Sequence, residues 1–563
     1  MTARVAAAPL WAHALALAVV LLALVPVIGT RASWSADEGA AIVQARHLAA
    51  GKGWAVAHPF PEVDPGAAAY PLELSTRGPA GTAPFVKHPL YALLLAGADR
   101  VGGVAAMVAL SLAGTVVAAA LAAALAARLR PGLSRPTLWA VGLATPLLFD
   151  GYLVIAHTLG AACSAAAVLL ALGAVEGRRH RWAWAAGAGA AVAAAVLVRT
   201  EAVFLGVGLG VAVAAVACWR RSRPLAALAA AVVASAAAAH VGEGAWIAHI
   251  LGGRAVGLGG DPDAGVGLVA GRLQGFGLTW LRPGYGQFPT AEVALIIMLG
   301  AVVILGITVR RHPKDGRALT FLGSVAAVAA TAALALAPTN LVPGLLVACP
   351  VIAAGLVSLR RSTLDTVGAR LALGTFSMFA LAVLATQYAR GGSGEWGGRY
   401  FAIGLPVLVP VALVALTDAG RALAPRTRRG VAGALAACSV ALAVMGVAGL
   451  RDTHRLTARL MASADRAGRA VGPSGRPVMI ATNGAVPRLA WSTFDRQRWL
   501  LADPADLRPL AGRLQAAGVG QAVLVTDHLA RDLGDLGPGA TLRSRDGRPD
   551  GLGWQVAVVG LTP

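Results

Sequence analysis

The chain is poor in charge: only 13% of its 563 residues are Asp, Glu, Lys or Arg, whereas 57% are hydrophobic. A soluble globular protein has about 25% charged residues, so this composition excludes a soluble fold for the chain as a whole. The four cysteines lie in apolar runs without paired spacing, and they predict neither a disulfide framework nor a metal site. Walker A, strand-linked GxGxxG, HExxH and CxxC motifs are also missing, so the chemistry that these motifs serve is not indicated.

Long apolar runs dominate the first 450 positions instead. They are about 18 to 25 residues long, enough to cross a hydrocarbon core of roughly 30 Å. We expect a mainly α-helical, polytopic membrane bundle with about 13 spans. The predicted spans are 9–29, 103–127, 136–150, 152–175, 183–198, 202–219, 225–250, 291–309, 318–337, 341–359, 371–388, 400–417 and 430–450. The first is too long for a signal-peptide core, and Pro26 and Arg31 favour a retained anchor.

The net charge of +21 is concentrated in short loops between these spans. Twenty Lys and Arg residues fall in short loops on one side, against Arg199, Arg390 and Arg399 on the other. The positive-inside rule places the basic loops in the cytoplasm. This predicts a multi-pass plasma (inner) membrane protein with a cytoplasmic N-terminus, surrounded by membrane lipids, and argues against a nucleic-acid partner.

Three larger segments then fall outside the cell: 30–90, 251–290 and 451–563. The last segment differs from the rest of the chain. Its apolar runs at 478–482, 522–526 and 555–561 have the length of strands, and 504–517 has the pattern of an amphipathic helix. We therefore expect a transmembrane domain of residues 1–450, followed by a small extracytoplasmic α/β domain of residues 451–563.

The first of these loops opens with Ser35-Ala36-Asp37-Glu38, which has the form of a capping box for a helix that runs to about Ala50. A cap uses Glu38 and leaves Asp37 free to face a site. The helix N-terminus favours an anion by roughly 0.3–1 kcal/mol. Asp37 is thus a candidate general base for an acceptor hydroxyl, with Glu38 orienting it or the helix. A purely structural cap is the alternative.

The Asp37-Glu38 pair after the first span and the Lys87-His88-Pro89 step before the next bundle resemble the GT-C superfamily, especially the protein O-mannosyltransferases and aminoarabinose transferases. The resemblance covers the first seven spans best and does not extend visibly to 451–563. It implies a polyprenyl-phosphate sugar donor, inverting transfer on the extracytoplasmic face, and Asp37 as the catalytic base. Many relatives carry a second Pro after the His-Pro step, where this chain has Leu90, so His88 is assigned only to substrate binding.

A lipid phosphate leaving group needs cations near the membrane surface. The external candidates are Lys87, Arg199, Arg282 and Arg399. Arg199 belongs to an Arg-Thr-Glu turn between two spans, which is similar to turns in GT-C enzymes, and Glu201 in that turn is a candidate substrate contact.

The glycine-rich segment 391–400 lets the backbone approach a ligand. Glu395, Trp396 and Tyr400 are its candidate substrate contacts, because an acid and two aromatic rings can bind a sugar. Its Gly-Arg-Tyr turn resembles those of RgtA-like glycosyltransferases. A flexible turn with interfacial aromatic residues is the alternative.

Metal binding has little support in the sequence. Asp261 and Asp263 are spaced for a cation but are more commonly solvated loop acids, so no metal ligand is assigned and a divalent cation is left open. His157, His240 and His249 lie in or at the ends of spans, where we expect satisfied bundle residues.

These observations predict an integral membrane glycosyltransferase that moves a hexosyl or pentosyl group from polyprenyl phosphate to a cell-envelope glycan, lipid or protein. Mannose and arabinofuranose are equal candidates for the sugar. The absence of a cytosolic nucleotide domain supports the lipid-linked donor. Two alternatives stay open: a transporter or flippase of lipid-linked sugars, which should show inverted halves and charged residues at midspan, and a non-catalytic envelope scaffold.

Overall fold

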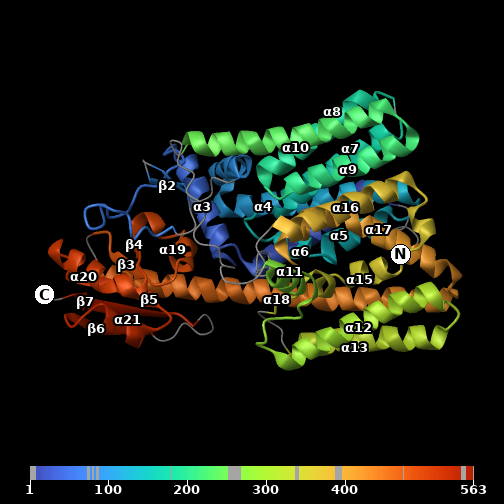
Figure 1. The fold of residues 1–563 in the computed structure, drawn as a ribbon. Coiled ribbons are helices and arrows are strands. Elements are labelled where there is room, and N and C mark those ends of the chain that lie inside the picture. Colours follow the sequence, from blue (N-terminus) through green and yellow to red (C-terminus); the bar gives the residue numbers. More distant parts are fainter. Residues whose placement is uncertain are drawn as a thin grey trace.

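The computed structural model shows a long helical bundle with a small α/β unit at one end (Figure 1). It describes residues 8–72, 76–78, 81–83, 88–177, 179–250, 268–336, 341–386, 396–472, 475–546 and 553–561. Several residues singled out from the sequence lie outside the described residues, namely Lys87, Asp261, Asp263, Arg390 and Glu395.

Eleven helices within the described ranges are long and apolar enough to cross a membrane. They are α2 (Leu10–Ile28), α4 (Pro89–Leu129), α7 (His157–Val175), α8 (Arg181–Val198), α9 (Ala202–Arg220), α10 (Arg223–Ile250), α12 (Pro289–Arg311), α13 (Gly316–Leu336), α16 (Val367–Thr386), α17 (Leu405–Ala419) with its flanking turns, and α18 (Pro425–Val471). Each overlaps a predicted span, although α4 begins 14 residues before the predicted 103–127 and is kinked at Gly102 and Gly103, and α18 continues 21 residues beyond the predicted 430–450. The predicted class, a multi-pass helical membrane protein, is therefore confirmed.

The predicted number of thirteen spans is not confirmed, because two of the predicted spans are broken. Helices α5 (Ser134–Leu143) and α6 (Leu147–Asp150) are separated at Pro146, and α14 (Leu345–Ala348) and α15 (Pro350–Val357) at Pro350. Proline lacks the N–H that would continue a helix. The two breaks lie together, since Cys349 Sγ donates a hydrogen bond to Ala144 O at 3.3 Å. Broken helices are tolerated at membrane depth where protein surrounds them.

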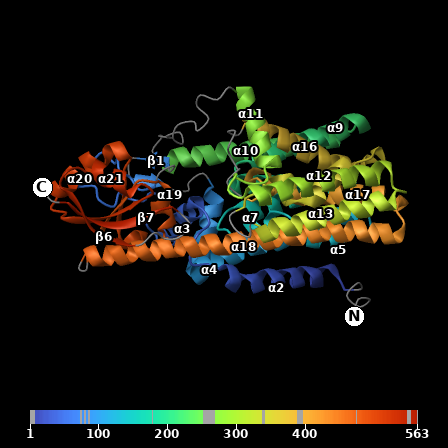
Figure 2. The same ribbon diagram turned by 90° about the horizontal axis from the view of Figure 1, so that it is seen from below.

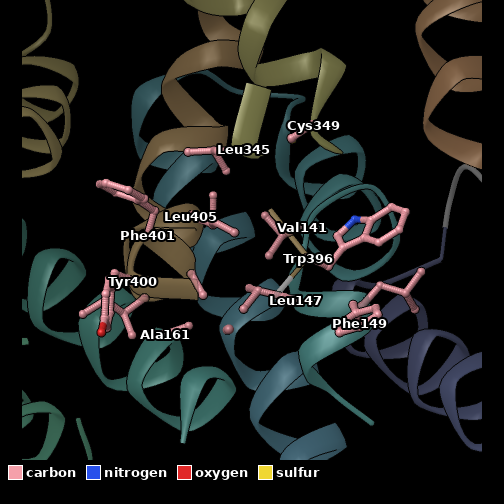
Figure 3. Close-up of a cluster of buried hydrophobic side chains, with 14 of the residues drawn as sticks. Val141, Leu147, Phe149, Ala161, Leu345, Cys349, Trp396, Tyr400, Phe401 and Leu405 are labelled. Carbon is pink, nitrogen blue, oxygen red and sulfur yellow. The ribbon is translucent and has the colours of Figure 1, made fainter. Parts of the chain in front are cut away.

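Figure 3 shows side chains of this region, with Val141 and Leu147 from one broken segment and Leu345 and Cys349 from the other. All four are fully or almost fully buried. The two breaks therefore lie against one another inside the bundle, where neighbouring side chains surround most of the interrupted backbone.

The basic loops gather at the end of the bundle away from the α/β unit. Arg128 Nη1 donates to Glu176 Oε2 at 2.6 Å, which ties the end of α4 to the end of α7, and Arg130 pairs with Asp418 in the last turn of α17. Helix α18 starts at this same end. We call the opposite end, which carries the α/β unit, the domain end. The short basic loops are thus together at one end of the bundle, while the direction of insertion stays a prediction.

The α/β unit contains a five-stranded sheet in the order β4-β3-β5-β7-β6. Its strands are β3 (Val478–Ala481), β4 (Arg498–Leu501), β5 (Gln521–Thr526), β6 (Ala540–Asp546) and β7 (Gln555–Leu561). The first three in spatial order are parallel, and β7 runs antiparallel to both β5 and β6. Helix α20 (Leu507–Ala516) buries its apolar face in the same core. The strands and the helix predicted from the sequence are present; β4 and β6 were not predicted.

Helix α18 joins the two parts of the molecule. Its 47 residues run without interruption from the bundle into the α/β unit, as Figures 1 and 2 both show. The first loop joins them as well, because Phe60, Val63 and Ala69 share a core with the sheet and Leu501 N donates to Ala69 O at 3.0 Å. A domain boundary at residue 450 therefore stays a prediction, since the helix passes straight through it.

Candidate functional site

Helix α3 (Ala36–Ala49) begins with the predicted capping box. Ser35 Oγ accepts a hydrogen bond from Glu38 N at 3.4 Å, and Glu38 Oε2 accepts from Ser35 N at 3.0 Å and Trp34 N at 2.7 Å. The other carboxylate oxygen, Glu38 Oε1, accepts a bond from Val154 N at 2.8 Å. Glu38 is only 2% exposed. Its carboxylate therefore fixes the start of α3 against the segment that leads into α7, which fits the orienting role.

Asp37 lies one position before Glu38 in the same turn, and its carboxylate faces two guanidinium groups. Arg399 Nη1 donates to Asp37 Oδ2 at 2.9 Å, and Arg488 Nη1 lies 3.5 Å from Asp37 Oδ1. The Asp37 side chain is nevertheless 32% exposed. A carboxylate held on both oxygens and still accessible is suited to take a proton from a substrate hydroxyl.

Arg399 reaches Asp37 because two glycines precede it in a tight turn. Gly397 and Gly398 adopt φ values of +72° and +70°. A Cβ on Gly397 would lie 2.1 Å from the Pro146 ring, and one on Gly398 would lie 2.7 Å from Thr279 O. Only glycine satisfies both the conformation and the space. The glycines thus bring the η3 turn (Arg399–Gly404) close to the break between α5 and α6.

Trp396 and Tyr400 flank this turn (Figure 3). The Trp396 ring stacks on Phe149 with a centroid distance of 5.7 Å, and the Tyr400 ring lies beneath the guanidiniums of Arg399 and Arg199 at 5.3 and 5.7 Å. Both side chains are 5% exposed. In this conformation they pack and orient the turn, so a sugar contact by either ring stays a prediction.

Arg199 forms a buried ion pair with Glu201 in the turn between α8 and α9. The Nε–Oε2 distance is 2.9 Å and the Nη2–Oε1 distance is 3.1 Å. The two residues are 5% and 8% exposed. The fork of the guanidinium matches the carboxylate, and Glu201 neutralises Arg199 in this state. The predicted turn is confirmed, whereas its two charged residues bind one another.

His88 lies against two polar residues, one on helix α10 and one in the turn between α8 and α9. Its Nδ1 is 3.8 Å from Glu243 Oε1 on α10, and Thr200 Oγ1 lies 3.4 Å from His88 Nδ1 and 3.5 Å from Glu243 Oε1. Sequence reasoning missed Glu243. The signal was present: a single acid inside a predicted apolar span costs about 2.5–3.5 kcal/mol on insertion, which is typical of a functional or paired residue.

A second buried pair was also missed. Asp150 Oδ2 lies 3.4 Å from His157 Nδ1, and these side chains are 1% and 0% exposed. Asp150 ends the broken helix α6 and His157 begins α7, so the pair spans the connection that Glu38 holds through Val154. His157 is thus a buried bundle residue, as expected.

Arg282 follows the π-helical turn η1 (Gly277–Leu281), which contacts Gly398 through Thr279. Its guanidinium lies 3.6 Å from the centroid of the Tyr285 ring, and Nη2 donates to Val342 O at 3.5 Å. This places Arg282 next to the turn that carries Arg399. A donor-phosphate contact by Arg282 stays a prediction.

An apolar cavity of about 720 Å³ lies in the bundle, between α2, α5, α17 and α18. A smaller cavity next to it shares Leu143, Leu148 and Val447 with the first and is also lined by Phe149 and Trp396. At about 10 Å³ this second cavity has room for a single water, so it forms no open passage from the large cavity to the turn that holds Arg399. Within the described ranges, no three His, Cys, Asp or Glu residues are grouped to hold a metal ion.

Comparison with known proteins supports the fold. No protein-family model matches the chain, and no curated protein matches it in sequence. The crystal structure of ArnT from Cupriavidus metallidurans in the apo state is 13% identical, covers 98% of this chain and 97% of its own, and has a TM-score of 0.52. The same ArnT bound to undecaprenyl phosphate gives 16% identity, coverage of 98% and 97%, and a TM-score of 0.46.

An archaeal structure is also similar. The oligosaccharyltransferase AglB from Archaeoglobus fulgidus, in complex with an inhibitory peptide and a dolichol-phosphate, is 13% identical, with coverage of 92% of this chain and 70% of AglB, and a TM-score of 0.49. The chain therefore has the GT-C fold that the sequence motifs predicted. At this level of identity the likeness concerns the fold alone.

Proposed function

We propose that this chain is an integral membrane glycosyltransferase that moves a sugar from a polyprenyl-phosphate donor to an extracytoplasmic cell-envelope acceptor. One observation carries the proposal: Asp37, at the domain end of a GT-C fold, is held by Arg399 and Arg488 and is still 32% exposed. A reactive carboxylate must be both oriented and accessible, and Asp37 is both.

The reaction follows from these groups. Asp37 accepts the proton of an acceptor hydroxyl while the hydroxyl oxygen attacks the anomeric carbon of the sugar. The bond from that carbon to the phosphate oxygen breaks, the configuration inverts, and polyprenyl phosphate leaves with the bonding electrons. Arg399 is the first candidate to stabilise the departing phosphate, because its guanidinium lies beside Asp37 and the planar fork of an arginine matches phosphate oxygens.

The polyprenyl tail needs an apolar site close to the phosphate. The cavity of about 720 Å³ between α2, α5, α17 and α18 offers this environment. We assign the tail to this cavity. The phosphate would then lie at the domain end, with Arg282 and Lys87 as further candidate contacts.

The test is sugar transfer by purified protein in detergent from a panel of polyprenyl-phosphate sugars. Asp37→Asn should lower the rate by about 100- to 10,000-fold, the range expected for loss of a general base. Asp527→Asn is a matched control, since Asp527 is an exposed acid of the α/β unit. Full activity in a folded Asp37→Asn would contradict the assignment of the base. Movement of labelled lipid across liposomes without any transfer would favour a flippase instead.

A further inference from the structure

We infer that Arg488 is a positioning residue for Asp37, and that the α/β unit thereby completes the catalytic site. The inference rests on the proposed function, because it takes Asp37 as the base. Arg488 lies in α19 (Ala485–Leu489), 451 positions from Asp37 in the chain. The other residues of the site belong to the bundle and its connections, so Arg488 brings a separate folded unit into the reaction centre.

The contact between α19 and α3 is close and specific. A Cβ on Gly39 would lie 1.9 Å from Arg488 O, so the backbone of α19 lies directly on α3 where a side chain is absent. Seven residues further along α3, Arg46 lies over the Trp491 ring at 4.6 Å and donates to Trp491 O at 3.5 Å. Residues seven apart lie on the same helix face. One face of α3 therefore docks the α/β unit next to Asp37.

The Arg488 guanidinium is oriented by its own surroundings. Its Nε donates to Gly484 O at 2.9 Å, and the side chain is 9% exposed. This leaves Nη1 directed at Asp37 Oδ1 at 3.5 Å, an ion pair that is longer than a tight hydrogen bond. Contacts of this kind often shorten when substrate binds. The Arg488 guanidinium is thus already oriented toward Asp37 before substrate binds.

The two arginines contact different oxygens of the Asp37 carboxylate. Arg399 holds Oδ2 and Arg488 holds Oδ1, so rotation of the carboxylate is restricted from both sides. When a donor phosphate competes for Arg399, the contact from Arg488 still orients Asp37 toward the acceptor. Positioning of this kind has a large effect on rate, because a misplacement of about 1 Å can lower it by about 100-fold.

The experiment measures steady-state transfer by the full-length protein. Arg488→Ala should lower kcat by about 10- to 100-fold with little change in the KM for the donor, and Arg488→Lys should restore part of the loss. Where Arg488→Ala gives no folded protein, Arg488→Gln is measured with the same expectation. Arg496→Ala is the matched control, because Arg496 is an arginine of the same unit with a 66% exposed side chain. Arg46→Ala is a second control, because it weakens the docking of the α/β unit on α3 without removing a contact to Asp37.

The decisive readout is a double-mutant cycle. If Arg488 acts through Asp37, adding Arg488→Ala to Asp37→Asn should cause no further loss of kcat. A further loss of the same factor would overturn the inference, as would full activity in Arg488→Ala or an equal loss of kcat in Arg46→Ala. No transfer by the wild type from any donor would overturn the proposed function and this inference with it. Transfer by the wild type with an unaffected Arg488→Ala would overturn the inference alone.

Discussion

Two groups of charged residues lie near the domain end of the bundle, and they differ in how far water reaches them. Asp37 is 32% exposed and is shared by guanidiniums from distant segments. The second group consists of paired side chains that are 10% exposed or less, and it comprises Arg199–Glu201, His88–Glu243 and Asp150–His157. We call the second group the buried pairs.

The difference separates two roles. A charge removed from water needs a matched partner, and removing one partner destabilises the fold strongly. Asp37 is partly solvated, so its substitution disturbs the fold little and shows its effect in the reaction. The contrast predicts that variants at Asp37 change rate, whereas variants at the buried pairs change stability first.

The largest expected effect is on the transfer rate, and it distinguishes the two neighbouring acids of α3, Asp37 and Glu38. Asp37→Asn should reduce transfer by about 100- to 10,000-fold while the melting temperature stays near that of the wild type. Glu38→Gln should retain much more activity, because Glu38 bonds to backbone N–H groups. The measurement is transfer rate beside thermal unfolding in the same detergent. Equal losses of rate in the two variants would remove the distinction between the base and its supporting residue.

Breaking a buried pair should have the largest effect on stability. Arg199→Gln leaves Glu201 buried without its partner, and about 3–5 kcal/mol of stability should be lost, the range typical of a broken buried pair. Denaturant unfolding in detergent measures this loss. The double variant Arg199→Gln with Glu201→Gln should recover most of it, because neither charge then remains. A stable single variant with reduced donor affinity would instead indicate that Arg199 binds phosphate.

A smaller effect is expected where Glu38 holds backbone groups. Glu38→Ala leaves the N–H groups of Trp34, Ser35 and Val154 without this acceptor, so a loss of about 1–3 kcal/mol is expected. Unfolding followed by circular dichroism measures the loss, and hydrogen exchange at the start of α3 locates it. An unchanged stability would show that water replaces the carboxylate.

The smallest expected effect depends on pH and involves His58 in the first loop. Burial lowers the pKa of His58 below its ordinary 6.5, and it outweighs the opposing attraction of Asp64, whose Oδ2 lies 3.1 Å from His58 Nε2. The unfolded chain therefore binds the proton more readily, so this contribution to stability is present above pH 6.5 and is lost as the pH falls below it. Unfolding measured between pH 5 and about 8 checks this, with His58→Gln expected to flatten the slope.

Much of the membrane part and some strands of the α/β unit could be predicted from the sequence, because hydrophobic length and capping chemistry are local. The capping box at Ser35–Glu38, the turn at Arg199 and the strands at 478 and 555 are all present. The breaks at Pro146 and Pro350 were not predicted, because proline alone does not decide: Pro26 and Pro410 lie inside the continuous helices α2 and α17. That the two breaks meet is a contact between distant segments, which no local pattern reveals.

The candidate site was predicted only where its residues lie beside a sequence motif. Asp37 and Arg399 were both found, but their ion pair joins positions 362 apart, which no local pattern reveals. Arg488 lies in a unit whose arginines are numerous and mostly exposed, so nothing in its neighbours distinguished it. Glu243 could have been found, because an acid within an apolar helix is rare enough to require a reason.

The uninterrupted length of α18 has a consequence for the register between the membrane and the α/β unit. A continuous helix transmits both translation and rotation: each added residue advances the far end by about 1.5 Å and turns it by about 100°. A single residue inserted near position 455 would therefore turn the sheet and α19 away from α3. Seven inserted residues would nearly restore the angle but raise the unit by about 10 Å. The length of α18 thus sets both the distance and the rotation of the α/β unit relative to the bundle, and with them the position of Arg488 relative to Asp37.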